Sequence, residues 1–351
     1  MRSELELSVA DWLRRLADET GAFSIARVVT EPTRQGSAMW RPDVVAKLKL
    51  KDKASPVTLE IEAKKRLTPA EALATFERME ARRGKAVLVL CSPSISERVA
   101  EMCRKRGVSY LDEAGNCRIV APGLFIQIEG RGNVRPDTRP TIDVFATKSS
   151  RIVRILLSNP KRGWQVQALA KEAQISLGLA SKAKRALLER AFAEEREGLL
   201  FAREPEQLLR AWSNQYDVSK SKRIGLYALD SLPEVEKRIG EWCSGKGIRY
   251  ALTQYSGAWR MAPMVRYNRS SVYVESSPRE LIAALGSKPV NTGANLFLWT
   301  PYDPSVFYDL REVEGLSVVS PIQLYLDLIG EPGRGEEAAQ EILQRQIRPT
   351  W

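Results

Sequence analysis

The stretch from Leu169 to Arg190 most constrains what this chain folds into, because its pattern predicts two short helices joined by a tight turn. The pattern breaks between Gln174 and Gly178, and we expect Gly178 to take the positive φ of a sharp turn. The apolar residues of the first helix recur at helical spacing: Val166, Leu169, Ala170 and Ala173. The second helix is expected to bury Leu179, Ala183, Ala186 and Leu187.

The outer face of the second helix carries hydroxyl and basic side chains, namely Ser181, Lys182, Lys184 and Arg185. Lysine and arginine neutralise phosphates or pair with guanine edges, and small residues allow close approach, so this face is typical of a helix that enters the DNA major groove. The alternative is an ordinary helical hairpin whose basic face is solvated. The pattern favours the reading of duplex DNA.

The residues after this helix predict a small β-hairpin. Phe192 to Ala202 reads as two short strands with Glu195 to Gly198 between them, which would form the wing of a winged helix. Arg196 is expected at the tip of the hairpin, within reach of a phosphate. A further helix is predicted from Pro205 to Tyr216, and Asp217 to Arg223 reads as a polar, basic joint.

The positive charge of the chain is concentrated around this predicted module. The 351 residues include 54 Lys and Arg against 43 Asp and Glu, a formal charge of +11. Between Lys148 and Arg223 there are 16 Lys and Arg against 8 Asp and Glu, so most of the excess lies there. A concentrated positive charge indicates a polyanionic partner, which supports double-stranded DNA.

Composition excludes several classes of active site. The chain has no histidine, which excludes imidazole bases, Ser-His-Asp and Cys-His nucleophiles and His-ligated zinc. Its four cysteines form no CxxC pair, and Cys91 and Cys103 are expected to be reduced core residues. Since no apolar run approaches a membrane span, we expect a cytoplasmic protein without membrane contact.

The first 130 residues predict a mixed sheet with flanking helices. A helix is expected to end at Gly21, and a second to begin at Thr68 with a capping box to Glu71. Val57–Lys64 is the clearest strand, because Val57, Leu59, Ile61 and Ala63 alternate with Thr58, Glu60, Glu62 and Lys64. The turn-rich stretch 130–140, GRGNVRPDTRP, has the composition of a linker.

Pro42-Asp43, followed by Glu62-Ala63-Lys64, resembles the PD-(D/E)xK arrangement of restriction-endonuclease-like proteins over residues 8–128. The resemblance implies that Asp43 and Glu62 ligate Mg²⁺, that Lys64 gives electrostatic help to the attacking water, and that Glu60 lies nearby. Residues i and i+2 of a strand share a face, which permits this arrangement. The alternative is a solvent-facing strand of alternating charge, on a platform that binds DNA without cutting it.

Three phrases resemble AbiEi-type transcriptional regulators, the antitoxins of type IV toxin–antitoxin systems. They are YLDEAGN at Tyr110–Asn116, QLYLDL at Gln323–Leu328 and GRGEEAA at Gly333–Ala339. The family implies a winged helix that represses its own operon, and a cognate toxin as partner. The nuclease-like front region goes beyond the simplest pattern of this family.

Together these features predict a multidomain α/β (α+β) protein. We expect a restriction-endonuclease-like domain at 1–130, a linker at 131–147, a winged helix-turn-helix domain at 148–218 and a mixed α/β domain at 219–351. The leading hypothesis is a DNA-binding, antitoxin-like transcriptional regulator. The alternatives are a Mg²⁺-dependent nuclease that the winged helix delivers to DNA, and a scaffold that binds other proteins.

Overall fold

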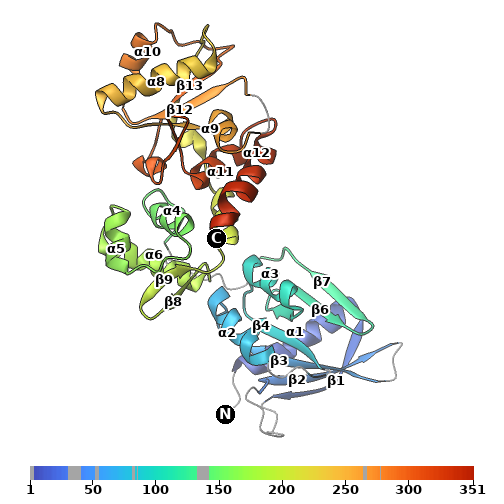
Figure 1. Cartoon of the computed structure of the whole chain (residues 1–351). Coiled ribbons are helices and arrows are strands. Elements are labelled where there is room, and N and C mark those ends of the chain that lie inside the picture. Colours follow the sequence, from blue (N-terminus) through green and yellow to red (C-terminus); the bar gives the residue numbers. More distant parts are fainter. Residues whose placement is uncertain are drawn as a thin grey trace. The chain divides into compact units, whose positions relative to one another are not determined.

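The computed structural model describes residues 4–30, 41–51, 55–80, 84, 86–132, 142–263, 267–276 and 278–351. The chain divides into two compact units, Met1–Thr141 and Ile142–Trp351 (Figure 1). Both units combine helices with β-sheet, which confirms the predicted mixed α/β class. Most of the predicted linker, residues 133–141, lies outside the described residues.

The first unit is built on a seven-stranded mixed sheet whose strands follow the order of the chain, β1 to β7. The strands are β1 (Phe23–Thr30), β2 (Val44–Leu50), β3 (Val57–Ala63), β4 (Val87–Ser92), β5 (Ser109–Asp112), β6 (Cys117–Ala121) and β7 (Leu124–Ile128). The pairs β3–β4 and β4–β5 are parallel and all other neighbours are antiparallel. Parallel pairing requires crossover connections, and helices supply them.

Three helices accompany this sheet: α1 (Glu4–Thr20), α2 (Pro69–Glu80) and α3 (Glu97–Arg106). The apolar face of α1, including Leu13 and Leu16, packs into one core with Leu59 and Ile61 of β3. Ile61 and Glu62 are neighbours on a strand and point to opposite faces, so Glu62 faces away from α1. Arg78 of α2 reaches Glu62, which places α2 over that opposite face.

The local signals predicted for the first unit are confirmed. Gly21 after α1 has φ of 58°. Thr68 and Glu71 form the predicted capping box, in which each side chain accepts a hydrogen bond from the backbone N–H of the other residue, at 2.7 and 3.2 Å. Cys91 and Cys103 are fully buried free thiols.

The second unit begins with four helices and a hairpin: α4 (Ser150–Ser158), α5 (Val166–Glu172), α6 (Leu177–Glu189), β8 (Ala193–Arg196), β9 (Leu199–Ala202) and α7 (Pro205–Ser213). The predicted succession of helix, turn, helix, hairpin and helix is therefore present. Trp164 and Trp212 are buried in its core. In the region that follows, Trp242 and Trp259 are only half-buried.

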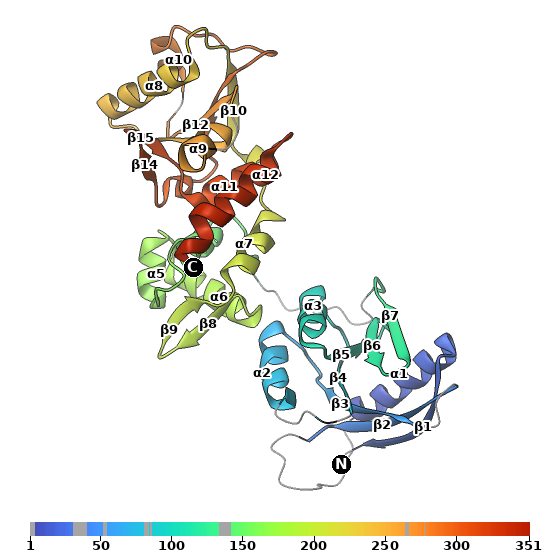
Figure 2. The same cartoon turned by 45° about the vertical axis from the view of Figure 1, so that its right-hand side comes forward.

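The rest of this unit holds a six-stranded mixed sheet in the order β10-β13-β12-β11-β15-β14. These strands are β10 (Lys222–Leu226), β11 (Tyr250–Thr253), β12 (Ser270–Val274), β13 (Leu296–Thr300), β14 (Arg311–Val313) and β15 (Leu316–Val318). The helices around it are α8 (Leu232–Lys246), α9 (Gln254–Met261), α10 (Arg279–Ala284), α11 (Pro321–Ile329) and α12 (Gly335–Ile342), which continues as a π-helical turn to Ile347 (Figure 2).

Two predictions for this region need correction. The segment Asp217–Arg223 was expected to be a joint, but Lys222 and Arg223 begin β10, which pairs with the apolar strand β13. Helix α9 and the strands β14 and β15 were not predicted, because each is short and gives little periodicity. No helix in the described ranges is long and apolar enough to cross a membrane.

Candidate functional site

The connection between α5 and α6 differs from the prediction. Gln174 takes the positive φ, 52°, whereas Gly178 lies in the first turn of α6. The prediction for Gly178 is therefore wrong. Helix α6 begins one residue before this glycine, where the Ser176 hydroxyl caps the helix by accepting a hydrogen bond from the Leu179 N–H at 3.3 Å.

The buried face of α6 consists of Ala180, Ala183, Ala186 and Leu187. Leu179, which was expected in the core, is only half-buried, and Ala180 takes its place. Alanine at these positions lets α6 approach the other helices closely. The helix is therefore rotated about its axis relative to the prediction, and Ser181, Lys182 and Arg185 of the predicted basic face remain exposed.

The predicted DNA-binding side chains of α6 divide into two groups. Ser181, Lys182 and Arg185 are exposed. Within the described residues, Lys182 and Arg185 have no ion pair, so both cations are available to a phosphate. Lys184 instead forms an ion pair with Glu195 of the hairpin at 2.6 Å, and its side chain is only 22% exposed. This pair holds the hairpin against α6.

The hairpin turn is tighter than predicted. The strands β8 and β9 pair up to Arg196 and Leu199, so Glu197 and Gly198 alone form the turn, with φ of 51° and 78°. Arg196 ends β8, and its side chain is 67% exposed. Its guanidinium pairs with Glu194 and lies 5.5 Å from the Phe201 ring centroid. Glutamates therefore offset much of the positive charge near the turn.

In the first unit, the three residues of the PD-(D/E)xK resemblance come together. Asp43 lies directly before β2, and one of its carboxylate oxygens accepts a hydrogen bond from the Ala63 N–H at 2.8 Å. Glu62 is buried, with 4% of its side chain exposed, and Lys64 Nζ lies 2.7 Å from its carboxylate. Arg78 approaches the same carboxylate at 3.4 Å.

The electrostatics of this cluster bear on metal binding. Burial raises the pKa of Asp43, and repulsion from Glu62 adds to this effect. Two close carboxylates suit Mg²⁺, which takes few protein ligands and keeps water. However, the described part of the chain holds no cluster of three or more metal-ligating Cys, Asp or Glu residues. The cations of Lys64 and Arg78 already compensate Glu62.

A buried carboxylate in the second unit, Asp327 of α11, was not predicted from the sequence. Desolvation raises its pKa to about 6, although four side chains donate hydrogen bonds to it. The donors are Tyr216 at 2.7 Å, Thr253 at 2.6 Å, Tyr273 at 3.2 Å and Gln323 at 2.7 Å. Because Tyr216 follows α7, the cluster ties the helical region to the six-stranded sheet. An aspartate inside the apolar run QLYLDL was the available signal.

The free energy of unfolding should depend on pH through Asp327. The folded protein retains this proton between about pH 4 and 6, where the unfolded chain, with pKa near 3.8, has lost it. Stability is therefore expected to fall by roughly 3 kcal/mol as pH rises through this window, and Asp327→Asn should remove that part of the slope. Urea denaturation at a series of pH values measures it, with exposed Asp230→Asn as the control. Identical slopes in both variants would contradict this role.

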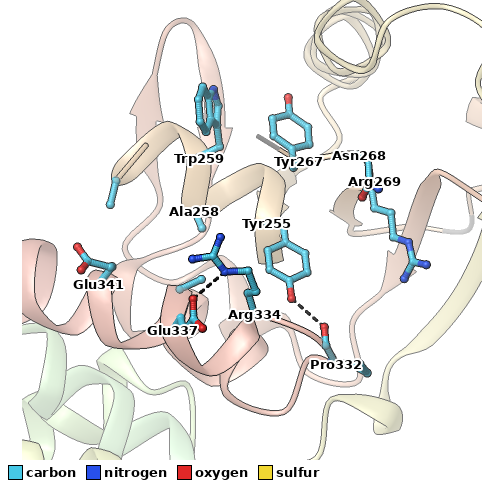
Figure 3. Close-up of a pocket in the computed structure, with 12 residues that line it drawn as sticks. Tyr255, Ala258, Trp259, Tyr267, Asn268, Arg269, Pro332, Arg334, Glu337 and Glu341 are labelled. Atoms are coloured by element: carbon cyan, nitrogen blue, oxygen red, sulfur yellow. Dashed lines mark hydrogen bonds and ion pairs between the residues drawn. The ribbon is translucent and has the colours of Figure 1, made fainter. Parts of the chain in front are cut away.

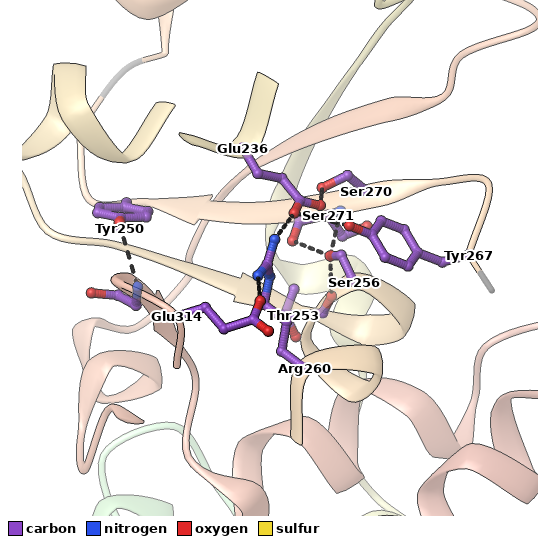
Figure 4. A network of polar contacts seen from close by, with 10 residues as sticks. Glu236, Tyr250, Thr253, Ser256, Arg260, Tyr267, Ser270, Ser271 and Glu314 are labelled. Atoms are coloured by element: carbon purple, nitrogen blue, oxygen red, sulfur yellow. Dashed lines mark hydrogen bonds and ion pairs between the residues drawn. The ribbon is translucent and has the colours of Figure 1, made fainter. Parts of the chain in front are cut away.

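A second buried polar cluster surrounds Glu236 of α8, which is fully buried (Figure 4). Arg260 of α9 approaches its carboxylate at 2.7 Å and also pairs with Glu314 at 2.6 Å. The hydroxyls of Tyr267 and Ser270 donate to Glu236 at 3.0 and 2.7 Å. Within the described residues, the carboxylate's contacts come from α9, from Tyr267 before β12 and from Ser270 at the start of β12.

A cavity of about 280 Å³ lies between α9 and the turn into α12 (Figure 3). Tyr255, Trp259 and Tyr267 give it an aromatic wall. Among its polar side chains, Arg334 pairs with Glu337 at 2.7 Å, and the Tyr255 hydroxyl donates to the Pro332 backbone carbonyl at 2.8 Å. The aromatic wall suits a flat or apolar group.

Comparison with known proteins concerns the second unit. No curated protein and no solved structure is significantly similar to the chain. Residues 202–348, which extend from the end of β9 to the C-terminal turn, match the family described as "Transcriptional regulator, AbiEi antitoxin, Type IV TA system". This region includes the Asp327 and Glu236 clusters and the aromatic cavity, and it begins just after the basic face of α6.

Proposed function

We propose that the protein is a DNA-binding transcriptional regulator of the antitoxin type, which reads duplex DNA with α6 as the recognition helix of a winged helix. The observation that carries this proposal is the exposed pair Lys182 and Arg185, two cations without ion pairs in the described part of the chain. Ser181 lies beside them, and one face of α6 thus presents a hydroxyl and two cations.

The family match supports the regulatory part of the proposal. It covers residues 202–348, directly after the hairpin, and its description names a transcriptional regulator and an antitoxin. In this proposal α4–α6 and the hairpin form the DNA-binding module. The matched region follows that module in the chain and packs with it in the same unit. A cognate toxin is the proposed protein partner.

The proposal also assigns an unequal role to the hairpin. Arg196 is exposed, but Glu194, Glu195 and Glu197 surround it. The negative charges of these glutamates repel the DNA phosphates, so the hairpin contributes less to DNA affinity than α6 does. The ion pair between Glu195 and Lys184 lets the hairpin hold the recognition helix in place.

The direct test is binding to the DNA that precedes the protein's own coding sequence. Footprinting is expected to show one or more protected sites there, and a scrambled duplex of equal length is expected to bind more weakly. Equal affinity for both duplexes would reduce the function to non-specific binding. No binding at moderate salt would contradict the proposal as a whole.

A second candidate function rests on the convergence of Asp43, Glu62 and Lys64. Here the first unit is a restriction-endonuclease-like nuclease, in which Asp43 and Glu62 would hold Mg²⁺. When bound, the metal supplies charge neutralisation and lowers the pKa of water. Lys64 lies 2.7 Å from Glu62, where its ammonium would stabilise negative charge that develops on a phosphate.

For the nuclease candidate, Mg²⁺ or Mn²⁺ is expected to raise the melting temperature of the wild type. At a hundredfold excess over Kd, linkage gives about 2.7 kcal/mol of stabilisation. Asp43→Ala and Glu62→Ala should lose this shift, because each removes one carboxylate ligand. Lys64→Ala should keep the shift yet cleave no supercoiled or branched DNA.

Glu101→Ala serves as the control for this series, since Glu101 is an exposed acid of α3 outside the cluster. It is expected to retain the wild-type shift. If the metal changes neither melting nor cleavage in the wild type, the first unit acts as a platform without catalysis.

A further inference from the structure

A second, smaller cavity of about 130 Å³ lies within the second unit. Its walls come from α4, from the end of α5 and from the 3₁₀ turn η2 (Pro304–Phe307). The cavity therefore lies between α4 and α5 of the proposed DNA-binding module and the segment that follows β13. Three of its lining residues are arginines: Arg151, Arg154 and Arg249.

Two of these arginines are already neutralised by acids. Arg151 forms a bidentate pair with Asp303, with the shortest contact at 2.8 Å. Arg249 Nε donates to the Glu275 carboxylate at 3.0 Å. Arg154 differs, because within the described ranges its guanidinium has neither an ion pair nor a hydrogen bond.

Arg154 is also almost fully buried, with 1% of the residue exposed. Its Nε and Nη1 atoms lack hydrogen-bond partners. Its guanidinium carbon lies 4.9 Å from the Trp212 ring centroid, a cation–π contact that stabilises the charge only in part. A buried cation without an acid is costly, and arginine does not escape that cost by losing its proton. An anion in the adjoining cavity would remove the cost.

The other groups of the cavity agree with an anionic ligand. Among the described residues, its one acidic lining residue is Glu172, which is exposed and engages the Tyr308 hydroxyl. The rest of the lining combines the polar Gln174 and Ser305 with apolar residues such as Ile155 and Phe307, which lower the local dielectric constant and strengthen attraction to Arg154.

We propose that this cavity binds a small phosphate group, with Arg154 as its main cationic partner. Guanidinium forms a planar fork of donors that matches phosphate oxygens. A cavity of about 130 Å³ admits inorganic phosphate or the phosphate end of a small phosphomonoester.

The site offers a route to regulation, a step that rests on the proposed function. A phosphate bound between α4 and η2 would bridge the DNA module and the region beyond it. Since a ligand stabilises the arrangement that it binds, occupancy would bias how α6 is presented to DNA. The affinity of the wild type for its DNA is therefore expected to change with phosphate at constant ionic strength.

The test uses inorganic phosphate as the probe, with chloride replacing it at constant ionic strength. Isothermal titration and thermal melting of the full chain should show saturable binding at one site. Arg154→Met, which keeps the bulk of the side chain without the charge, should weaken phosphate binding about tenfold or more. Arg334→Gln in the larger, aromatic cavity is the matched control and should bind phosphate like the wild type.

A further variant separates this cavity from the DNA face. Lys182→Ala/Arg185→Ala should keep phosphate binding while its binding to duplex DNA is weakened. The proposal is overturned if the wild type shows no phosphate-specific effect, or if Arg154→Met binds phosphate as tightly as the wild type does. Phosphate binding without any DNA binding would instead contradict the proposed function alone.

Discussion

Replacing Lys182, Lys184 and Arg185 together by alanine should abolish binding to duplex DNA while leaving the protein folded. Lys182 and Arg185 are exposed and lack ion pairs in the described residues, so each is expected to neutralise one phosphate. Each lost contact reduces the slope of log K against log salt by about 0.9. For the double variant Lys182→Ala/Arg185→Ala, the slope should therefore be smaller in magnitude by about 1.8 than for the wild type. Fluorescence anisotropy over a salt series measures it.

The structure predicts that the three cations contribute unequally. Lys184→Ala alone should change the slope least, since this ammonium is paired with Glu195 at 2.6 Å. The control is Arg279→Ala/Lys288→Ala, which removes two exposed positive charges near α10 and lowers the net charge equally. If the control weakens DNA binding as much as Lys182→Ala/Arg185→Ala, net charge and not α6 explains the affinity.

Local sequence signals predicted much of the fold. The end of α1 at Gly21 and the capping box at Thr68 depend on backbone rules that act within four residues. The alternation in β3 likewise follows from the two faces of a strand. The stretch YLDEAGN contains turn residues, and a tight turn is present there: Gly115 has φ of 86°, and Asp112 accepts hydrogen bonds from Asn116.

The errors arose where packing between distant segments decides the structure. The choice between Leu179 and Ala180 as a core residue depends on how closely α6 approaches its neighbours. The positive φ of Gln174 places a non-glycine residue in a region that glycine adopts more easily, which sequence rules do not anticipate. Tertiary contacts must stabilise that conformation.

The candidate sites show the same division. The approach of Lys64 to Glu62 was predictable, because both lie two residues apart at the end of one strand. The arrival of Arg78 from α2 was not. The apolar run around Asp327 signals burial, but the donors that surround its carboxylate come mostly from distant segments. Arg154 acquires its chemistry from burial, which its neighbours along the chain do not specify.

Replacing Arg260 by methionine should destabilise the second unit by about 3–5 kcal/mol, because it leaves Glu236 buried without its cation. Glu236 is fully buried and, of its contacts within the described residues, would retain the hydroxyls of Tyr267 and Ser270. Glu236→Gln should cost less, since Arg260 keeps its second partner, Glu314, at 2.6 Å. Urea denaturation followed by tryptophan fluorescence measures both free energies.

The double variant Glu236→Gln/Arg260→Met completes a thermodynamic cycle. It should be more stable than Arg260→Met alone, because it removes the unpaired buried charge. Lys237→Ala is the matched control from the same helix: its ion pair with Glu241 spans 3.9 Å between side chains that are 75% and 65% exposed. Such an exposed ion pair contributes about 0–1 kcal/mol to the free energy of unfolding. If Arg260→Met costs no more than this control, water reaches Glu236 and the cluster does not stabilise the junction of α8 and α9.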